Sequence, residues 1–340
     1  MRFLVMGCGG IGGVATAVLT ESGCDVTALT TNLSIADAVA RNGLQVRGDG
    51  PARSVKGRVV GTLPEGESFD AVLLCTQPPQ VEAAARTALP ALAPDGVMVC
   101  LQNGLCEARV GAIAGAERTV GAVVAWGAAM PEPGVYERTA AGGFALGMLD
   151  GQAHPKLDEL ARALEAIGPV EVTNNLAGKR WSKLAINAAI SSLGTIGGDR
   201  LGAIMQLRFV RRAALEIMTE CVHVARKCGV RMEKVSGTID LDWMALTEAE
   251  RAAAGSPSLV AKHAMLLAVG FRYRRMRSSM LAAIERGRTP AVDFLNGEVC
   301  DRGRALGVPT PVNDRAREMV WSIARGERKS GIEALRELAG

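Results

Sequence analysis

The most constraining feature of this 340-residue chain lies in its first dozen residues. A short apolar run, Met1–Met6, leads directly into a stretch with the spacing G-x-G-x-x-G, and a helical pattern follows. In a strand–turn–helix unit the first glycine permits a tight turn, the second lets a pyrophosphate approach the backbone, and the third lets the helix pack closely on the sheet. The alternative is a glycine-rich turn without a ligand. We expect a dinucleotide site formed by Gly7, Cys8, Gly9, Gly10, Ile11 and Gly12 at a helix N-terminus.

Composition narrows the class of protein. No apolar stretch reaches the roughly 18–20 residues of a membrane span, and Met1–Met6 lacks the features of a signal peptide. The eight cysteines include no C-x-x-C pair, which favours buried thiols in a reducing compartment. A net charge of +4 is too small to indicate a nucleic-acid partner. We expect a cytoplasmic protein that binds neither membranes nor nucleic acid.

The first half alternates between strand-like and helix-like stretches, which is typical of a doubly wound parallel sheet. The second strand ends at Thr30, and a helix capped by Ser34 follows it. We expect further strands at 69–75, 96–101, 120–128, 134–138, 144–148 and 170–172, and helices at 35–42, 81–92 and 157–167.

From about Thr173 onward the pattern is helical, with no convincing strand. We expect helices at 181–190, 203–229, 258–286, 294–306 and 314–324. The fold class is therefore a Rossmann-type α/β domain over residues 1–172, followed by an all-α substrate domain over 173–340. The charged stretch Ala245–Gly255 is expected to be a solvated surface insertion.

The end of the second strand bears on the choice of cofactor. NAD sites usually place an acidic residue there, whereas this chain has Thr30-Thr31-Asn32. Without that carboxylate nothing repels a 2′-phosphate, and the Thr31 hydroxyl could donate to it. We expect NADP(H), with NAD(H) or dual use left open; Arg41, the nearest basic residue in the sequence, lies far along the following helix.

Several short motifs, in order from residue 1 to about 320, resemble the ketopantoate reductase family. They are the glycine loop, Leu101-Gln-Asn-Gly104, Trp181-Ser-Lys-Leu-Ala-Ile-Asn187, Ser278-Ser-Met-Leu281, Val292-Asp-Phe-Leu-Asn-Gly297 and Gly307-Val-Pro-Thr-Pro-Val-Asn313. The resemblance implies an NADPH-dependent reductase of 2-oxo acids with this two-domain plan and an active site between the domains.

Lys183 is the expected proton donor. Reduction of a ketone requires a proton for the developing alkoxide, and burial on an apolar helix face would lower the pKa of a lysine toward the working pH. The alternative is a surface lysine beside Trp181. Asn187 lies one turn further along the same face. The resemblance further implies that Asn103 contacts the cofactor and that Ser279, with Ser278, holds the substrate carboxylate; a turn residue and a helix N-cap are the respective alternatives.

Three positions depart from the family pattern. Gln77, a cofactor-side candidate, stands where the family usually has lysine, and Ser191, a substrate-side candidate, stands where it has a second asparagine. Ala291 stands where an active-site glutamate is expected. A pocket without that lysine and glutamate is more apolar, so we expect a different and bulkier substrate than ketopantoate.

The remaining charged residues suggest no metal, because the three histidines have no metal-like spacing. Arg274 or Arg277 could pair with the substrate carboxylate, although a solvated arginine cluster is the simpler interpretation. His263 is expected in the core or on the surface. An imine- or opine-type reductase and a non-catalytic NADP-binding sensor remain alternatives. The expected partners are a small-molecule substrate and a second copy of the chain in a homodimer.

Overall fold

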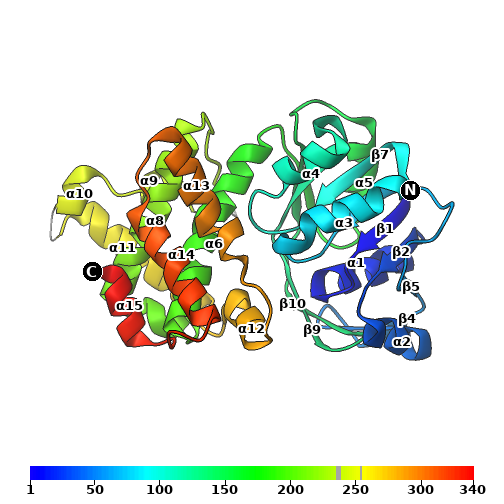
Figure 1. Cartoon of the computed structure of the whole chain (residues 1–340), viewed down its shortest axis with the longest axis horizontal. Helices are drawn as coiled ribbons and strands as arrows, with labels where there is room; N and C mark the ends of the chain where they lie inside the picture. The colour runs from blue at the N-terminus through cyan, green and yellow to red at the C-terminus, as the bar shows by residue number, and fades with distance from the viewer. Residues whose placement is uncertain (235–238, 253–254) are drawn as a thin grey trace. The chain divides into compact units, whose positions relative to one another are not determined.

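The computed structural model describes residues 1–234, 239–252 and 255–340. They form two compact units (Figure 1). The first comprises Met1–Gln102 and Cys106–Leu176, and the second comprises Asn103–Leu105 and Ala177–Gly340. The first unit is an α/β fold and the second is helical, which confirms the expected fold class. None of the helices within the described ranges has the length and apolar character needed to cross a bilayer.

An eight-stranded sheet forms the centre of the first unit. Its spatial order is β12-β11-β8-β7-β6-β1-β2-β5, and every pairing is parallel except that of β11 with β8. The strands are β1 (Arg2–Met6), β2 (Asp25–Leu29), β5 (Arg58–Val60), β6 (Phe69–Leu74), β7 (Leu92–Cys100), β8 (Thr119–Val124), β11 (Phe144–Met148) and β12 (Val170–Val172).

The strand order reverses between β1 and β6. The chain winds outward from β1 through β2 to β5, and then returns to the other side of β1 with β6, β7 and β8. In open parallel sheets ligands bind at the carboxyl ends of the strands beside such a switch point. Here those ends carry Gly7, after β1, and Cys75, after β6. The expected glycine loop therefore lies at the position that the topology favours for a ligand.

The five helices of the first unit cover the two faces of this sheet. They are α1 (Gly10–Glu21), α2 (Leu33–Asn42), α3 (Val81–Ala88), α4 (Glu107–Ala114) and α5 (Pro155–Leu164). Alternate β1 residues point to opposite faces, so Phe3 and Val5 join the apolar cluster of α1 and α5. The expected helix at 81–92 ends early because Leu89-Pro90-Ala91 forms a 3-10 turn and Leu92 already begins β7.

A second, four-stranded sheet was not expected. It has the order β4-β3-β10-β9 and packs on α1, which thus lies between the two sheets. Its strands are β3 (Leu44–Arg47), β4 (Arg53–Val55), β9 (Gly127–Glu132) and β10 (Val135–Ala140). The expectation of one strand over 120–128 was wrong, because the chain leaves the large sheet at Val124 and enters the small one at Gly127.

The helical unit has one apolar core, and its helices run through the colours green to red in Figure 1. They are α6 (Leu176–Gly197), α7 (Leu201–Met205), α8 (Arg208–Lys227), α9 (Leu241–Met244), α10 (Glu248–Ala252), α11 (Pro257–Arg272), α12 (Ser279–Glu285), α13 (Asn296–Leu306), α14 (Pro311–Ala324) and α15 (Ile332–Ala339). No strand element lies among the described residues of 177–340.

Three helix predictions were wrong at caps or breaks. Asn32, not Ser34, caps α2, because its Oδ1 accepts a hydrogen bond from the Ser34 N–H. The expected helix at 203–229 is divided by Gln206-Leu207, and the one at 258–286 ends at Arg272 and resumes at Ser279. Apolar periodicity continues across such breaks, so it does not reveal them.

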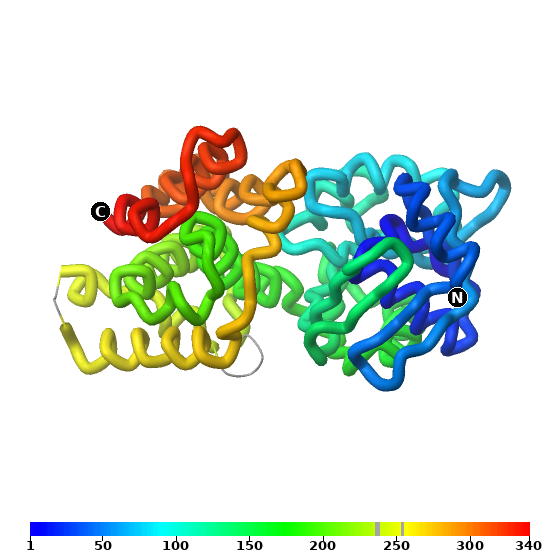
Figure 2. Tube along the Cα trace, turned by 90° about the horizontal axis from the view of Figure 1, so that it is seen from below, coloured from blue at the N-terminus to red at the C-terminus, as the bar shows by residue number. Residues whose placement is uncertain are grey.

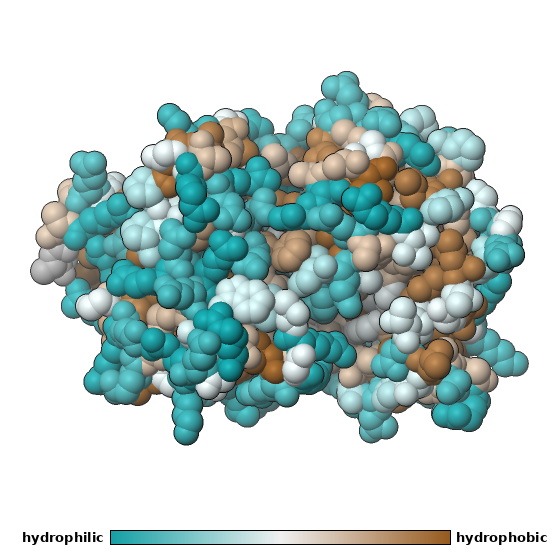
Figure 3. All heavy atoms as spheres, in the orientation of Figure 1, coloured by the Kyte–Doolittle hydropathy of each residue, from teal (hydrophilic) through white to brown (hydrophobic). Residues whose placement is uncertain are grey.

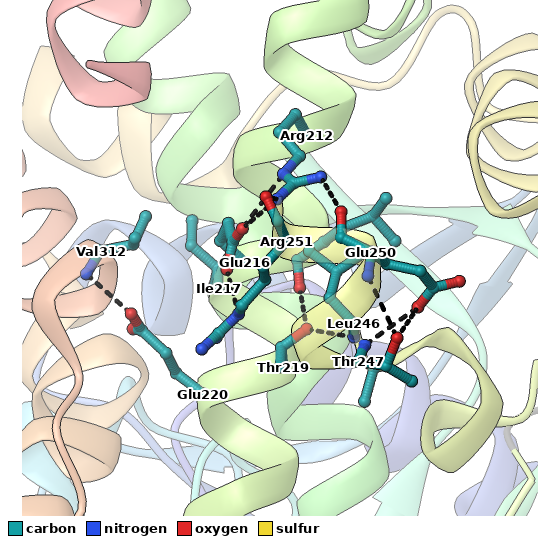
Figure 4. Close-up of polar contacts among 12 residues, drawn as sticks. Arg212, Glu216, Ile217, Thr219, Glu220, Leu246, Thr247, Glu250, Arg251 and Val312 are labelled. Carbon is teal, nitrogen blue, oxygen red and sulfur yellow. Dashed lines mark hydrogen bonds and ion pairs between the residues drawn. The ribbon is translucent and has the colours of Figure 1, made fainter. Parts of the chain in front are cut away.

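The segment expected to be a solvated insertion is instead anchored in the core, although residues 253–254 lie outside the described ranges. Ala245, Leu246 and Glu250 are buried. The Thr219 hydroxyl on α8 accepts a hydrogen bond from the Leu246 N–H, and Glu250 receives the Thr247 N–H (Figure 4). A buried ion pair with Lys262 compensates the charge of Glu250, so a charged sequence is compatible with burial here.

Candidate functional site

The glycine loop contains two glycines that the fold itself requires. Gly7 has φ +99°, and a Cβ there would lie 3.1 Å from the Thr76 nitrogen. A Cβ on Gly12 would lie 1.9 Å from the Gly7 carbonyl oxygen, so α1 could not approach the end of β1. These are the roles of the first and third glycines of the motif.

Gly9 differs from its two neighbours in the motif. Its φ of −79° is available to any residue, and a Cβ built there meets nothing within 4 Å. Gly9 precedes the first turn of α1, where no side chain caps the helix. The fold therefore gives no reason for a glycine at this position, whereas a ligand on the helix N-terminus would.

The four-stranded sheet packs against the glycine loop and the start of α1, a contact that the sequence did not reveal. A Cβ on Gly10 would lie 2.7 Å from the Ala128 carbonyl oxygen of β9, and one on Gly13 would enter the Tyr136 ring of β10. The Tyr136 hydroxyl donates to the Cys8 carbonyl at 3.3 Å and lies 3.1 Å from the Cys8 sulfur. Burial raises the pKa of the Cys8 thiol to about 11, so Cys8 is a packing residue. Ile11 is half-buried beside the same cluster.

Neutral polar residues follow the other strands at this edge of the sheet. Thr31 is exposed after β2, and Asn32 beside it is engaged as the cap of α2. Arg41 occupies the last turn of α2, at the far end of that ten-residue helix. After β6, Gln77 is exposed and precedes a 3-10 turn. The edge therefore offers hydroxyl, amide and helix N–H groups to a ligand.

Asn103 belongs to the helical unit, although it follows a strand of the first unit. Gly104 has φ +94°, and a Cβ there would lie 2.5 Å from the Phe294 carbonyl oxygen. Leu105 contributes to the core of the helical unit. Asn103 itself is exposed. The structure thus brings the Asn-Gly turn next to the 3-10 turn Ala291–Phe294, which begins at the residue where the resemblance led us to expect a glutamate.

The candidate substrate residues share one face of α6. Lys183, Asn187 and Ser191 follow one another at intervals of four, and all three are half-buried. The flanking Leu184 and Ala188 are buried in the core of the unit. The partly open face of α6 therefore carries an amine, an amide and a hydroxyl in a row.

Ser278 has a structural task beside this face. It caps α12 by accepting a hydrogen bond from the Leu281 N–H, and its hydroxyl donates to the Ser191 carbonyl at 2.9 Å. Gly194 allows this approach, since a Cβ there would lie 3.1 Å from the Ser278 Cβ. Ser279 is exposed at the first position of α12.

A row of buried, hydrogen-bonded polar side chains contacts the core side of α6. It gives a structural role to two of the sequence motifs, Val292–Gly297 and Gly307–Asn313. Asn296 donates its amide to the Ala188 carbonyl of α6 at 3.2 Å and to Asn313 Oδ1 at 3.0 Å. Asn313 in turn donates to Glu220 at 2.7 Å. At the start of α14, the Glu220 carboxylate also accepts hydrogen bonds from the Val312 N–H (Figure 4) and from the Asn313 N–H. Burial raises the pKa of this carboxyl.

The other charged candidates lie as follows. Arg277 forms an exposed ion pair with Glu285 at 2.8 Å, and Arg274 covers the Phe271 ring. His263 is buried, and burial together with nearby arginines lowers its pKa. Asp293 is engaged by Arg317 at 2.7 Å and by the Trp321 indole at 3.1 Å. No cluster of metal-binding side chains occurs among the residues that the structure describes.

The comparisons with known proteins show that this two-domain chain is an oxidoreductase. The chain belongs to the ketopantoate reductase family: the family model "Ketopantoate reductase PanE/ApbA" matches residues 3–151, and its C-terminal counterpart matches 175–324. The matches confirm the resemblance seen in the motifs.

Individual relatives are distant but similar over their whole length. The 2-dehydropantoate 2-reductase of Pyrococcus horikoshii is 23% identical over 97% of this chain and 99% of its own. A D-mandelate dehydrogenase solved with NADH and anilino(oxo)acetate is 18% identical, with a TM-score of 0.80 over 96% of this chain and 99% of its own. A dimeric ketopantoate reductase from Staphylococcus aureus is 16% identical, with a TM-score of 0.72 over 96% and 100%.

Proposed function

We propose that this protein is an NADPH-dependent reductase that delivers a hydride to the carbonyl carbon of a 2-oxo acid or a related ketone. The observation that carries the proposal is the partly open face of α6, on which Lys183 and Asn187 stand one turn apart. In a helix whose other faces are core, an amine and an amide at this spacing suit a carbonyl oxygen and its neighbouring groups.

The glycine loop fits a dinucleotide. Gly9 leaves open space where a side chain would otherwise stand, and the uncapped first turn of α1 presents free N–H groups. When bound, the nicotinamide would supply the hydride. Gly7, Gly9 and Gly10 would face the pyrophosphate, while Thr31, Gln77 and Asn103 are the proposed further contacts.

NADPH is the proposed form of the cofactor. No carboxylate stands in Thr30-Thr31-Asn32, and the positive end of the α2 dipole lies at this point. Both features favour a 2′-phosphate. The structural neighbour solved with NADH makes NADH the necessary comparison.

Lys183 is the proposed general acid. Its ammonium would donate one proton to the oxygen of the carbonyl group as the carbon accepts the hydride, which leaves a neutral amine and a 2-hydroxy acid. Asn187 would donate an amide N–H to the same substrate, and Ser279 with Ser191 would hold its carboxylate. The Ser278 hydroxyl is engaged in capping and tethering, so its proposed contribution is to position Ser279.

The substrate is proposed to be bulkier and more apolar than ketopantoate. Gln77 and Ala291 replace a lysine and a glutamate of the family pattern, and Ile186 and Ile190 are half-buried beside Asn187 on α6. The fold is shared with a D-mandelate dehydrogenase, whose named substrate carries a phenyl group on a 2-hydroxy acid. An aryl-substituted 2-oxo acid is therefore the proposed substrate class.

A substrate panel tests the proposal. Oxidation of NADPH and of NADH is followed with ketopantoate, with 2-oxo-2-phenylacetate, and with 2-oxo acids plus amines. We expect the aryl acid to be reduced well and ketopantoate poorly, and Ala291→Glu with Gln77→Lys to raise the ketopantoate rate. Turnover only with amines would support the imine- or opine-type alternative, and binding without turnover would support the sensor. The comparisons favour neither alternative.

The proposal includes an oligomeric state, the homodimer, and a compartment, the cytoplasm. A homodimer is supported by the dimeric state named for the Staphylococcus aureus neighbour. A cytoplasmic location is supported by the eight cysteines, all of which are free thiols and most of which are not exposed.

A further inference from the structure

The exposed face of α11 is apolar along most of the helix. Its only charged residue before Arg272 is Lys262, and that side chain is buried against Glu250 at 2.6 Å. From Val260 to Phe271 every exposed side chain is apolar, and Val260, Leu267 and Phe271 are 63%, 42% and 71% exposed. A helix that is apolar on all sides is normally covered on all sides. The remaining members of this stripe are Ala261, Ala264 and Ala268.

The apolar residues are concentrated here and not scattered. Among the residues that the structure describes, ten large apolar side chains are exposed, and six of them belong to the segment from Trp243 to Met276. Figure 2 shows α11, in yellow, along the outer edge of the helical unit. By contrast, the side of this unit seen in Figure 3 is mainly hydrophilic. A concentration of this kind marks an interaction surface.

The two ends of α11 carry opposite charge. Asp240–Ala252, before the helix, contains four carboxylates and one arginine, whereas Arg272–Arg277, which begins at the last residue of the helix, contains four arginines and no carboxylate. Glu250 pairs with Lys262 and Asp242 pairs with Arg226, so Asp240 and Glu248 are the carboxylates that this segment can offer to a partner. Two copies of α11 placed antiparallel around a two-fold axis would bring the arginines of each copy beside the acidic segment of the other.

The stripe is also complementary to itself in shape. In an antiparallel pair centred between Met265 and Leu266, Ala264 of one copy faces the partner's Leu267, so that a small side chain meets a large one. The helix is about 24 Å long, long enough to form the centre of an interface. Tyr273 and Met276, which are also exposed, extend the apolar area at one end.

We propose that the α11 stripe, Val260 to Phe271, is the surface through which two copies of this chain associate, with the two helices antiparallel. The inference rests on the homodimer proposed above and assigns its interface. An anionic membrane is the other ligand class that suits arginines beside apolar side chains, but the acidic segment at the opposite end of the helix would be repelled by it.

Sedimentation velocity tests the interface. We expect the wild-type protein to be a dimer at micromolar concentration, and Leu267→Asp and Phe271→Asp to raise the dimer dissociation constant by about 100-fold. Ile332→Asp on α15 is the matched control, because Ile332 is similarly exposed at 44% but lies outside the stripe. A monomeric wild type, or dimers unaffected by both stripe variants, would overturn the inference.

Charge reversal tests the orientation and guards against misfolded variants. Arg275→Glu and Glu248→Arg should each weaken the dimer, and the double variant should restore it in an antiparallel pair. Failure of the double variant to recover, or binding of the wild type to anionic vesicles without self-association, would contradict the proposal. Reductase turnover is measured on the same samples, so a dimer formed elsewhere overturns the interface and leaves the proposed activity standing.

Discussion

The two candidate functional regions, one in each unit, differ in what they are made of. In the α/β unit the glycine loop acts through its backbone: Gly7 and Gly12 are required by close packing, and Gly9 by nothing in the protein. In the helical unit the site consists of side chains, the amine of Lys183 and the amide of Asn187, on a helix held by a row of buried polar side chains. Added side-chain volume therefore disturbs the glycine loop, whereas removal of an amine or an amide changes the chemistry of the α6 face.

Lys183→Ala gives the largest expected effect and tests the side chains of the α6 face. Turnover on the true substrate should fall by roughly 10²–10⁴, the usual contribution of a general acid, while cofactor affinity stays the same. Single-turnover kinetics and calorimetry measure the two quantities. Lys179→Met, one turn earlier on α6, is the control. An equal loss in the control would show that the helix needs positive charge and not a proton at residue 183.

Glu250→Gln tests how far buried charge stabilises the helical unit. It should lower the free energy of unfolding by about 3 kcal/mol, because Lys262 then remains buried without its partner. The exposed pair of Arg277 with Glu285 provides the control, since Glu285→Gln should cost less than about 1 kcal/mol. Urea unfolding measures both variants. Equal losses would contradict the distinction between buried and exposed pairs.

The same residue predicts a pH dependence. Burial alone would raise the Glu250 pKa, but hydrogen bonds from Lys262 and Thr247 outweigh it and lower the pKa from 4.5 to about 2. The carboxylate therefore stabilises the fold above pH 4.5, and this contribution is lost as the pH falls from 4.5 toward 2. The stability difference between wild type and Glu250→Gln should shrink over that range.

Gly9→Val tests the backbone of the glycine loop. The variant should keep its thermal stability, because a Cβ at residue 9 meets no atom, but its affinity for NADPH should fall by at least about tenfold. Gly12→Ala should lower both the thermal stability and the affinity for NADPH, because the alanine Cβ would clash with the Gly7 carbonyl oxygen. Calorimetry with NADPH and NADH measures affinity. Normal binding by Gly9→Val would remove the loop from the site, and a clear preference for NADH would overturn the choice of NADPH.

Tyr136→Phe gives the smallest expected effect. It removes the hydroxyl that contacts Cys8, which should lower the free energy of unfolding by about 1 kcal/mol.

Because the pKa of Cys8 is about 11, its thiol should resist alkylation at pH 8 while the exposed Cys228 reacts. Mass spectrometry after labelling distinguishes the two cysteines. Rapid labelling of Cys8 in the wild type would show that the loop opens in solution.

The α/β fold was predictable because its signals are local. Gly7–Gly12 follows an apolar strand directly, and Val170–Val172 appears as expected because three residues suffice for a short edge strand. Strands β3 and β4 were missed because they have four and three residues in a glycine-rich stretch, and the pairing of β3 with β10 spans a large part of the chain. Short strands depend on distant partners that periodicity does not reveal.

For the candidate site, the sequence predicts which residues of α6 share a helix face, but not how residues far apart in the sequence are arranged around them. Lys183 and Asn187 share a helix face because four-residue spacing dictates it. The place of Asn103 in the helical unit depends on the Phe294 carbonyl, far away in the sequence. The contact of Tyr136 with Cys8 is equally remote, and a lone tyrosine in a short strand gives no sign of it.

That tyrosine also sets an order of events during synthesis. Its hydroxyl meets Cys8 across 128 residues of sequence, and its ring occupies the space beside Gly13. The ribosome therefore releases the glycine loop early, but the loop acquires its final support only when the β9–β10 hairpin has followed. Contacts of such long range close slowly, because the intervening chain must first be ordered. A nascent chain ending at Val124 would carry the complete glycine motif but not β9 and β10, the strands against which the motif packs.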